Sequence, residues 1–162
     1  MKLNLGCGYD YREGYVNVDK YSEKADQRID LESLPWPWED NSVEEVLLIH
    51  TLEHLGQQTA LFLGIVQELY RVCANDALIH IDVPHPLHAD YLGDPTHCRP
   101  ITSEVLFLLN REYAEHLISI KAPGTPLAKY INVDFVMLQN NEYREEGKLR
   151  VSKFVLKVRK PL

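Results

Sequence analysis

Short apolar runs alternate with polar, turn-rich segments along the whole chain. Runs of roughly four to eight residues that end at glycine, proline or aspartate are typical of β-strands. We expect five such strands in the first half of the chain, at 2–5, 15–18, 27–31, 43–50 and 77–84. The run 43–50 predicts a strand that is buried on both faces of a sheet.

Two helices are predicted by a longer period. From Thr51 onward, apolar residues recur three or four positions apart, which indicates one amphipathic helix that buries Leu61, Phe62, Ile65, Leu69 and Val72. Thr102, with Glu104 in the first turn, predicts the start of a second helix that runs to about Tyr113. A loop rich in proline and histidine, 85–101, precedes it.

Strands that alternate with helices predict one α/β domain over 1–162, with a mostly parallel sheet in a three-layer arrangement. The last two apolar runs, 129–139 and 150–160, flank a charged turn and predict a C-terminal antiparallel hairpin. The first crossover is short, because only nine residues, Gly6 to Gly14, separate strands whose parallel pairing needs about ten to a dozen. We therefore expect a reduced first helix and a thinly covered sheet face, which favours a partner subunit and a homodimer.

Composition and charge narrow the class of protein. The chain is 45% hydrophobic and 25% charged, as in ordinary globular domains. A net charge of −7 opposes non-specific binding of nucleic acid, because the protein's own field repels phosphate. Three cysteines without a CxxC pair argue against a disulfide framework and a structural zinc site. We see no apolar leader and no membrane-length run, so we expect a cytoplasmic protein without membrane contact.

Candidate chemistry gathers where the predicted strands end, because open parallel sheets bind ligands there. Gly6-Cys7-Gly8 follows the first strand and lets backbone N–H groups approach a ligand, although an ordinary strand-to-loop break is the alternative. Asp19 follows the second strand and suits the two hydroxyls of a ribose, and Asp30 could accept a hydrogen bond from an exocyclic amine. Tyr11 stands where a dinucleotide motif has its third glycine, and no GxxxxGK[ST] motif occurs. The expected ligand is a nucleoside without phosphate.

Taken together, these motifs resemble the class I S-adenosylmethionine-dependent methyltransferases, in particular the broad type 11 group. The resemblance covers nearly the whole chain and is carried by four segments: "LNLGCG", "VNVD", "DLESLPWPWEDNSVEEVLLIHTLEHL" and "ELYRVCANDALIHIDVP". It implies S-adenosylmethionine as the cofactor. It also implies a minimal Rossmann-like fold with a seven-stranded sheet of order 3-2-1-4-5-7-6, whose last strand is antiparallel.

The resemblance implies a set of residues around the cofactor. These are Asn4, Gly6, Cys7, Gly8, Asp19, Asp30, Leu31 and His50, with His50 near the transferable methyl group. Asn4 takes the place of the acidic residue usual at the start of the glycine motif, so it can form hydrogen bonds but carries no charge. The "WPW" segment, 36–38, is interpreted as a hydrophobic plug rather than an aromatic wall of the site.

Histidines recur in "HTLEH" and in the loop before the second predicted helix, and three interpretations stay open. Glu53 and His54 could be structural and tie the strand-to-helix turn together. His50 and His97 could act as general bases, because imidazole titrates near neutrality and methyl transfer requires removal of the acceptor's proton. His50, Glu53, His54 and His97 could instead bind a divalent metal. That set is similar to the ligands of metal-dependent small-RNA 2′-O-methyltransferases, with His50 where those enzymes have Glu.

The loop 85–101 is the expected substrate segment, with His85, His88, Asp94 and Arg99 as candidate contacts. Turn formation by Asp94 and a surface role for Arg99 are the alternatives. The expected reaction is methyl transfer to a small-molecule acceptor, such as a sugar or glycan-precursor hydroxyl. Two further functions stay open: a non-catalytic protein that binds an adenosyl ligand, and a metal-dependent nucleic-acid 2′-O-methyltransferase.

Overall fold

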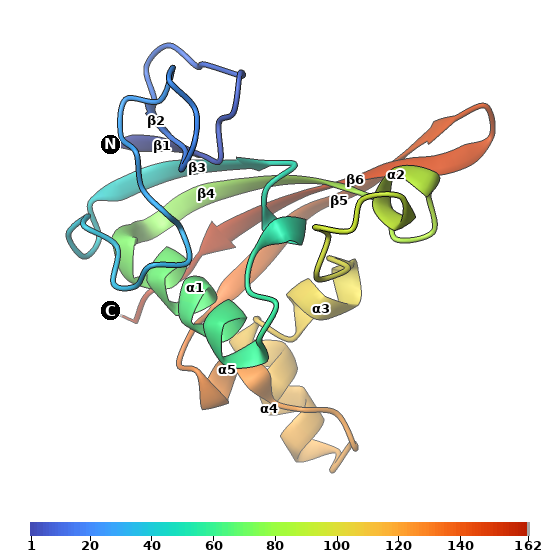
Figure 1. Ribbon diagram of the computed structural model, residues 1–162. Coiled ribbons are helices and arrows are strands. Elements are labelled where there is room, and N and C mark those ends of the chain that lie inside the picture. Colours follow the sequence, from blue (N-terminus) through green and yellow to red (C-terminus); the bar gives the residue numbers. More distant parts are fainter. Residues whose placement is uncertain (162) are drawn as a thin grey trace.

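Six strands form one mixed sheet in the computed structural model, which describes residues 1–161 (Figure 1). The strands are β1 (Lys2–Leu5), β2 (Val16–Val18), β3 (Val43–Ile49), β4 (Cys73–Pro84), β5 (Phe135–Glu145) and β6 (Lys148–Val158). Their order is β2-β1-β3-β4-β6-β5. The first four strands are parallel, and β6 is antiparallel to both of its neighbours, so β5 and β6 form the predicted hairpin.

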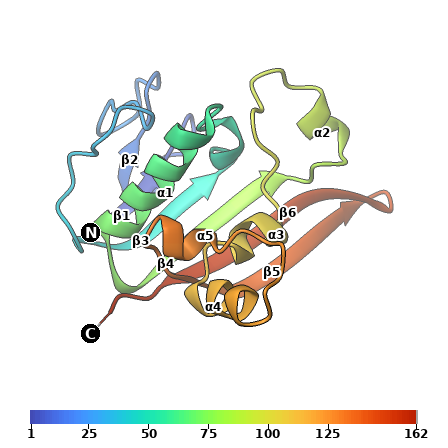
Figure 2. The same cartoon turned by 90° about the horizontal axis from the view of Figure 1, so that it is seen from below.

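The helices cover only one face of this sheet. In Figure 1 the helices on this face lie below the sheet, and in Figure 2 they lie in front of it. They are α1 (Thr59–Val72), α3 (Ser103–Phe107), α4 (Arg111–Ser119) and α5 (Leu127–Tyr130). A 3-10 turn, η1 (Leu52–His54), follows β3, and the single-turn helix α2 (Ala89–Leu92) lies in the loop after β4. The predicted three layers are therefore wrong: the two connections that would carry helices on the other face, 6–15 and 19–42, contain none. No helix in 1–161 is long and apolar enough to cross a membrane.

Two predicted elements are not formed as expected. The helix expected from Thr102 to Tyr113 starts at Thr102 but divides into α3 and α4, because the Asn110 side chain accepts a hydrogen bond from the N–H of Tyr113 at 2.8 Å and begins a new helix. The expected strand 27–31 is reduced to one bridge between Val18 and Gln27. The sheet therefore has six strands where seven were predicted.

Two buried asparagines take over the role of the missing first helix. Asn4 on β1 and Asn17 on β2 are paired in register, and Asn4 Nδ2 donates to Asn17 Oδ1 at 2.9 Å. Asn4 also donates to the carbonyl of Asp10 at 2.7 Å, and Asn17 Oδ1 accepts from the N–H of Arg12 at 2.8 Å. The loop 6–15 thus receives from side chains the hydrogen bonds that a helix would form within itself.

The sheet face opposite the helices is open and carries paired charges. Lys2 and Glu45 lie 2.7 Å apart, and His80 lies 3.2 Å from Glu45 across the next strand pair. Lys153 and Asp82 lie 2.6 Å apart in the same way. Burial alternates along β3, so this strand is buried on one face and not, as predicted, on both. A partner subunit on this face stays a prediction.

The "WPW" segment seals one end of the core between α1 and the sheet. Trp36 and Trp38 are only 3% and 6% exposed, and their rings meet edge to face with centres 5.6 Å apart. Arg71 of α1 donates to both tryptophan carbonyls, at 3.0 and 2.9 Å. The segment therefore has the contacts of a hydrophobic plug.

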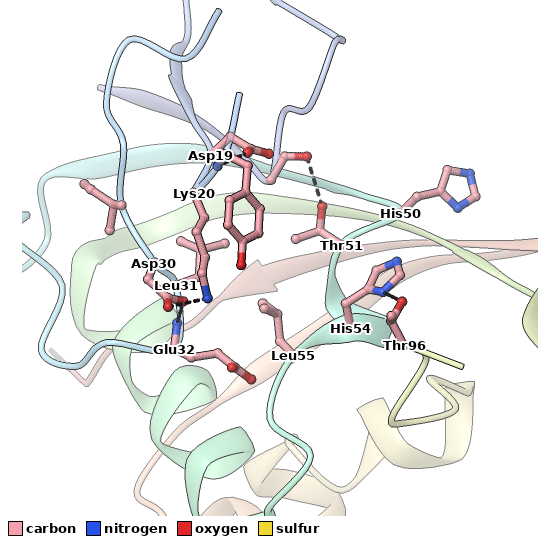
Figure 3. Close-up of a pocket in the computed structure, with 13 residues that line it drawn as sticks. Asp19, Lys20, Asp30, Leu31, Glu32, His50, Thr51, His54, Leu55 and Thr96 are labelled. Atoms are coloured by element: carbon pink, nitrogen blue, oxygen red, sulfur yellow. Dashed lines mark hydrogen bonds and ion pairs between the residues drawn. The ribbon is translucent and has the colours of Figure 1, made fainter. Parts of the chain in front are cut away.

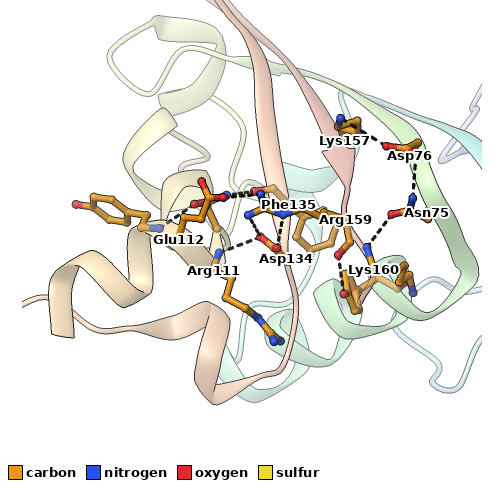
Figure 4. A network of polar contacts seen from close by, with 12 residues as sticks. Asn75, Asp76, Arg111, Glu112, Asp134, Phe135, Lys157, Arg159 and Lys160 are labelled. Atoms are coloured by element: carbon orange, nitrogen blue, oxygen red, sulfur yellow. Dashed lines mark hydrogen bonds and ion pairs between the residues drawn. The ribbon is translucent and has the colours of Figure 1, made fainter. Parts of the chain in front are cut away.

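An ion-pair network closes the base of the C-terminal hairpin (Figure 4). Asp134 precedes β5, is 6% exposed, and accepts from Nε of Arg159, just after β6, at 2.6 Å. Its other oxygen accepts from the N–H of Arg111 in the first turn of α4 at 3.0 Å. Glu112, which is exposed, binds the same arginine at 2.6 Å. The network therefore joins α4 to both strands of the hairpin.

We expect Asp134→Ala to lower the free energy of unfolding by about 2–4 kcal/mol, because it leaves Arg159 and a backbone N–H without their buried partner. Glu112→Ala is the matched control, since it removes the exposed partner of the same guanidinium and should cost less than about 1 kcal/mol. Chemical denaturation measures both values. Equal losses would contradict the assignment of Asp134 as the centre of the network.

Candidate functional site

A cavity of about 500 Å³, the first cavity, opens at the carboxyl ends of β1, β2 and β3 (Figure 3). This is the edge at which open parallel sheets bind ligands, and the volume is in the range of small-molecule sites. The lining residues are Gly6, Asp19, Lys20, Tyr21, Ile29, Asp30, Leu31, Glu32, His50, Thr51, His54, Leu55 and Thr96.

Gly6 and Thr51 form the part of the first cavity where β1 and β3 end. Thr51 Oγ1 lies 3.0 Å from the carbonyl oxygen of Leu5 and 3.1 Å from that of Ile49, so the hydroxyl holds the two strand ends together. Gly6 has φ +70°, and a Cβ at this position would lie 2.4 Å from Thr51 Oγ1. Both the backbone conformation and the contact therefore require glycine.

The Asp19 carboxylate joins the two loops that border the first cavity. Oδ2 accepts from the N–H of Gly8 at 2.9 Å, and Oδ1 accepts from those of Tyr21 and Ser22 at 2.7 and 2.8 Å. Burial acts to raise the pKa of Asp19, but the three N–H donors together lower it below its usual value. Because Oδ2 accepts only one of these bonds, it keeps acceptor capacity for a ligand.

The rest of the first cavity combines one ion pair with apolar side chains. Lys20 Nζ lies 2.6 Å from Asp30 Oδ2, and the hydrogen bond from Lys20 lowers the pKa of Asp30 (Figure 3). Ile29, Leu31 and Leu55 supply the apolar surface. Apolar walls with a few fixed polar groups are typical of small-molecule sites.

Five of the eight predicted cofactor residues line the first cavity, namely Gly6, Asp19, Asp30, Leu31 and His50. Asn4 does not line the first cavity: its side chain is buried and bonded to Asp10 and Asn17, and its contact with a cofactor stays a prediction. Cys7 is buried outside the lining, and Gly8 lines an adjoining cavity. Thr51 is a lining residue that was not predicted, although its place directly after a predicted strand was a usable signal.

A second cavity, of about 520 Å³, adjoins the first. Its lining residues are His50, Glu53, His54, Pro84, Asp90, Asp94, His97, Arg150 and Val151. Because His50 and His54 line both cavities, they form the partition between them. Arg150 and Val151 come from β6, and their place here depends on the register of the hairpin, for which the local sequence gives no signal.

His50 occupies the partition in a backbone conformation that is rare for a residue with a side chain. Its φ is +52°, in the left-handed region. The imidazole projects from the end of β3 (Figure 3). Its Nδ1 lies 3.5 Å from Glu53 Oε1. Interaction with the Glu53 carboxylate raises the pKa of His50 above its usual value, against the effect of burial.

Of the four predicted substrate contacts, Asp94 lines the second cavity and the other three do not. The Nδ1 atoms of His85 and His88 accept hydrogen bonds from backbone N–H groups of their own loop. Arg99 donates to the carbonyl of Gly56 at 3.1 Å and lies over a phenylalanine ring of α1. These three side chains make contacts within the protein, and their contact with a substrate stays a prediction.

We expect Gly6→Ala to destabilise the protein by about 3 kcal/mol or more, because a left-handed residue costs roughly 1–2 kcal/mol and the contact with Thr51 adds the cost of overpacking. Gly14→Ala is the matched control: its φ is +83° with nothing within 4 Å of the added Cβ, so it has the backbone cost alone. Thermal and chemical denaturation measure the difference. Equal losses of stability would show that the contact with Thr51 adds nothing to the cost of Gly6→Ala.

Comparison with known proteins gives a fold but no sequence family: no protein-family model and no curated protein sequence matches the chain. A SAM-dependent methyltransferase from Archaeoglobus fulgidus is 16% identical with a TM-score of 0.65, over 96% of this chain and 85% of that one. The 1,6-didemethyltoxoflavin-N1-methyltransferase of Burkholderia thailandensis, solved with 1,6-didemethyltoxoflavin and S-adenosylhomocysteine, is 13% identical with a TM-score of 0.57, over 98% and 71% of the two chains.

The same fold also serves another reaction. The cyclase SpnF is 14% identical to this chain with a TM-score of 0.51, over 98% of this chain and 75% of that one. Likeness at such identities concerns the fold, and the reaction has to be argued from the site. On these comparisons the chain has the fold of the class I S-adenosylmethionine-dependent methyltransferases.

Proposed function

We propose that this protein transfers a methyl group from S-adenosylmethionine to a small-molecule acceptor. The observation that carries the proposal is the pair of adjoining cavities that share His50 and His54 as their partition. In this arrangement the donor binds in the first cavity and the acceptor in the second. Because the two cavities adjoin at His50 and His54, the acceptor atom in the second can lie directly against the methyl group of the donor in the first, as an in-line displacement requires.

The residues of the first cavity fit an adenosyl ligand. Gly6, packed against Thr51 at the end of β1, borders the first cavity without a side chain of its own. Asp19 Oδ2 accepts from a ribose hydroxyl, and Asp30 accepts from the adenine amino group beside the apolar surface of Leu31. The ligand has no phosphate, which agrees with a strand end that is followed by a loop instead of a helix N-terminus.

S-adenosylmethionine supplies a methyl group on a sulfonium, and the bond pair between carbon and sulfur returns to sulfur when an acceptor lone pair attacks. The chain has to align the two molecules and remove the acceptor's proton. Of the two predicted bases, His50 borders both cavities, whereas His97 lines only the second. We therefore assign proton removal to His50.

The lining of the second cavity favours a polar acceptor with hydroxyl groups. Asp90 and Asp94 offer carboxylate oxygens from the loop after β4, and Arg150 offers a guanidinium from β6. Such a mixture of donors and acceptors suits a sugar or glycan-precursor hydroxyl. The second candidate function is an adenosyl-binding protein without methyl transfer, which the cyclase among the proteins of the same fold supports.

We expect the protein to bind S-adenosylhomocysteine and Asp19→Ala to lower that affinity at least about tenfold, because the ribose loses its acceptor. Asp26→Ala is the matched control: Asp26 also accepts from a backbone N–H of β2, but it does not line the first cavity. Isothermal calorimetry measures both affinities. Absence of heat and of thermal stabilisation with either adenosyl ligand would overturn the proposed function.

We expect His50→Asn to lower the rate of methyl transfer by about 100-fold or more, the usual contribution of a general base. Asparagine tolerates the left-handed backbone of this position, so the fold should be kept. His80→Asn, on the open sheet face, is the control. The assay is a panel of hydroxylated acceptors with release of S-adenosylhomocysteine as the readout. Equal rates for His50→Asn and the parent protein would remove His50 as the base.

A further inference from the structure

Glu53 is a buried carboxylate without a hydrogen-bond partner. It lies in η1 and is 1% exposed, and within 1–161 neither of its oxygens accepts a hydrogen bond. Burial of an uncompensated carboxylate is costly, because the charge is removed from water. His50 Nδ1 lies 3.5 Å from Oε1, but that side chain is 52% exposed and leaves the carboxylate unsatisfied. Glu53 is therefore left without a hydrogen-bond donor among the described residues.

A short chain of hydrogen bonds fixes the tautomer of His54. Thr96 donates its hydroxyl hydrogen to Asp94 Oδ1 at 2.6 Å. Thr96 Oγ1 must therefore accept from His54 Nδ1, which lies 2.9 Å away (Figure 3). Because Nδ1 carries the hydrogen, Nε2 of the neutral ring has its lone pair free.

His97 is held in the same tautomer by a different partner. Its Nδ1 lies 2.8 Å from the carbonyl oxygen of Tyr91, which can only accept, so Nδ1 carries the hydrogen. The ring also stacks on the Tyr91 ring with centres 5.2 Å apart. Nε2 is the free acceptor, and it lies 3.7 Å from Asp94 Oδ2, itself an acceptor. A second imidazole lone pair is therefore fixed in place beside carboxylate oxygens.

Three acceptors thus converge on one point. One ligand atom from each of Glu53, His54 and His97 lies within 4.8 Å of the other two. In the tautomers described above, the Glu53 carboxylate and the Nε2 atoms of both rings have no hydrogen to offer one another. We propose that Glu53, His54 and His97 bind a divalent first-row transition-metal ion at the edge of the second cavity.

The donor set selects the kind of ion. Two imidazoles and one carboxylate suit Zn²⁺, Mn²⁺, Fe²⁺ or Co²⁺, whereas Mg²⁺ and Ca²⁺ prefer oxygen ligands. Histidines that bind metals usually donate their other ring N–H to a protein acceptor, as His54 and His97 do here. His50 lies outside the cluster, so the four-residue set considered from sequence is reduced to three.

Three protein ligands leave coordination positions open toward the second cavity. This role rests on the proposed function: an acceptor oxygen bound there becomes more acidic and gives up its proton to His50 more readily. Binding of the ion itself does not require the donor, the acceptor or methyl transfer. It can therefore be tested with the metal alone.

Elemental analysis and calorimetry test the site directly. Protein without a histidine tag, freed of metal by a chelator, should bind about one Zn²⁺ per chain and gain thermal stability as it does so. Loading with Co²⁺ should give the visible absorption of a site with nitrogen and oxygen ligands. The absence of a stoichiometric ion, with no thermal shift on addition of Zn²⁺, Mn²⁺ or Co²⁺, would overturn the proposal.

Glu53→Gln separates a metal site from an internal ion pair. It keeps the shape and removes the charge, so Zn²⁺ affinity should fall about 10- to 100-fold or more, while the metal-free variant should melt at a higher temperature than the metal-free parent. A lower melting temperature of the metal-free variant would mean that a protonated histidine already compensates the carboxylate, and the proposal would fail.

Thr96→Val tests the positioning of His54 without removal of a ligand. Loss of its hydrogen-bond acceptor should weaken Zn²⁺ binding about 10- to 100-fold and change the Co²⁺ spectrum. His85→Gln is the control, because this histidine belongs to the same loop but not to the cluster. Equal affinities for Thr96→Val and the control would contradict the proposed geometry. Zn²⁺ binding without methyl transfer would retain the metal site and remove only the proposed function.

Discussion

The length of the connection between β1 and β2 constrains most of this structure. The chain has to return to the start of a parallel neighbour within 6–15, and no helix fits there. The side chains of Asn4 and Asn17 therefore form hydrogen bonds with backbone groups of this loop. The sheet face on that side has no helical cover (Figure 1). The same loop presents the N–H of Gly8 to Asp19, which brings the two loops at the edge of the first cavity together.

A backbone hydrogen bond between η1 and the loop after β4 brings the two cavities side by side. The carbonyl oxygen of Glu53 accepts from the N–H of Cys98 at 2.9 Å, which fixes the loop after β4 against η1. Without this contact His97 would not lie beside His54, and the second cavity would lose the wall that His97 forms. The site is thus assembled from two segments distant in sequence, each of which is a short, irregular piece of chain.

Local signals in the sequence predicted the residues that directly follow strands. Gly6 and Asp19 line the first cavity because parallel strands end at one edge, and this rule needs no tertiary information. Arg150 could not be found this way, because its position depends on which residues pair across the hairpin. The three layers were predicted from the general pattern of alternating strands and helices, while the length of the first crossover already indicated fewer helices.

The β2 edge of the sheet has a consequence for self-assembly. Asn17 uses its outward N–H on the Asp26 carboxylate and its carbonyl on the N–H groups of Asp26 and Gln27. This edge has no free row of backbone groups to template another strand, so fibril growth by edge-to-edge addition is blocked there. At the other edge, the exposed end of β5 carries the charged side chains Glu142, Arg144 and Glu145, which make it a poor apolar template for another strand. Both edges of the sheet therefore carry features that disfavour aggregation through added strands.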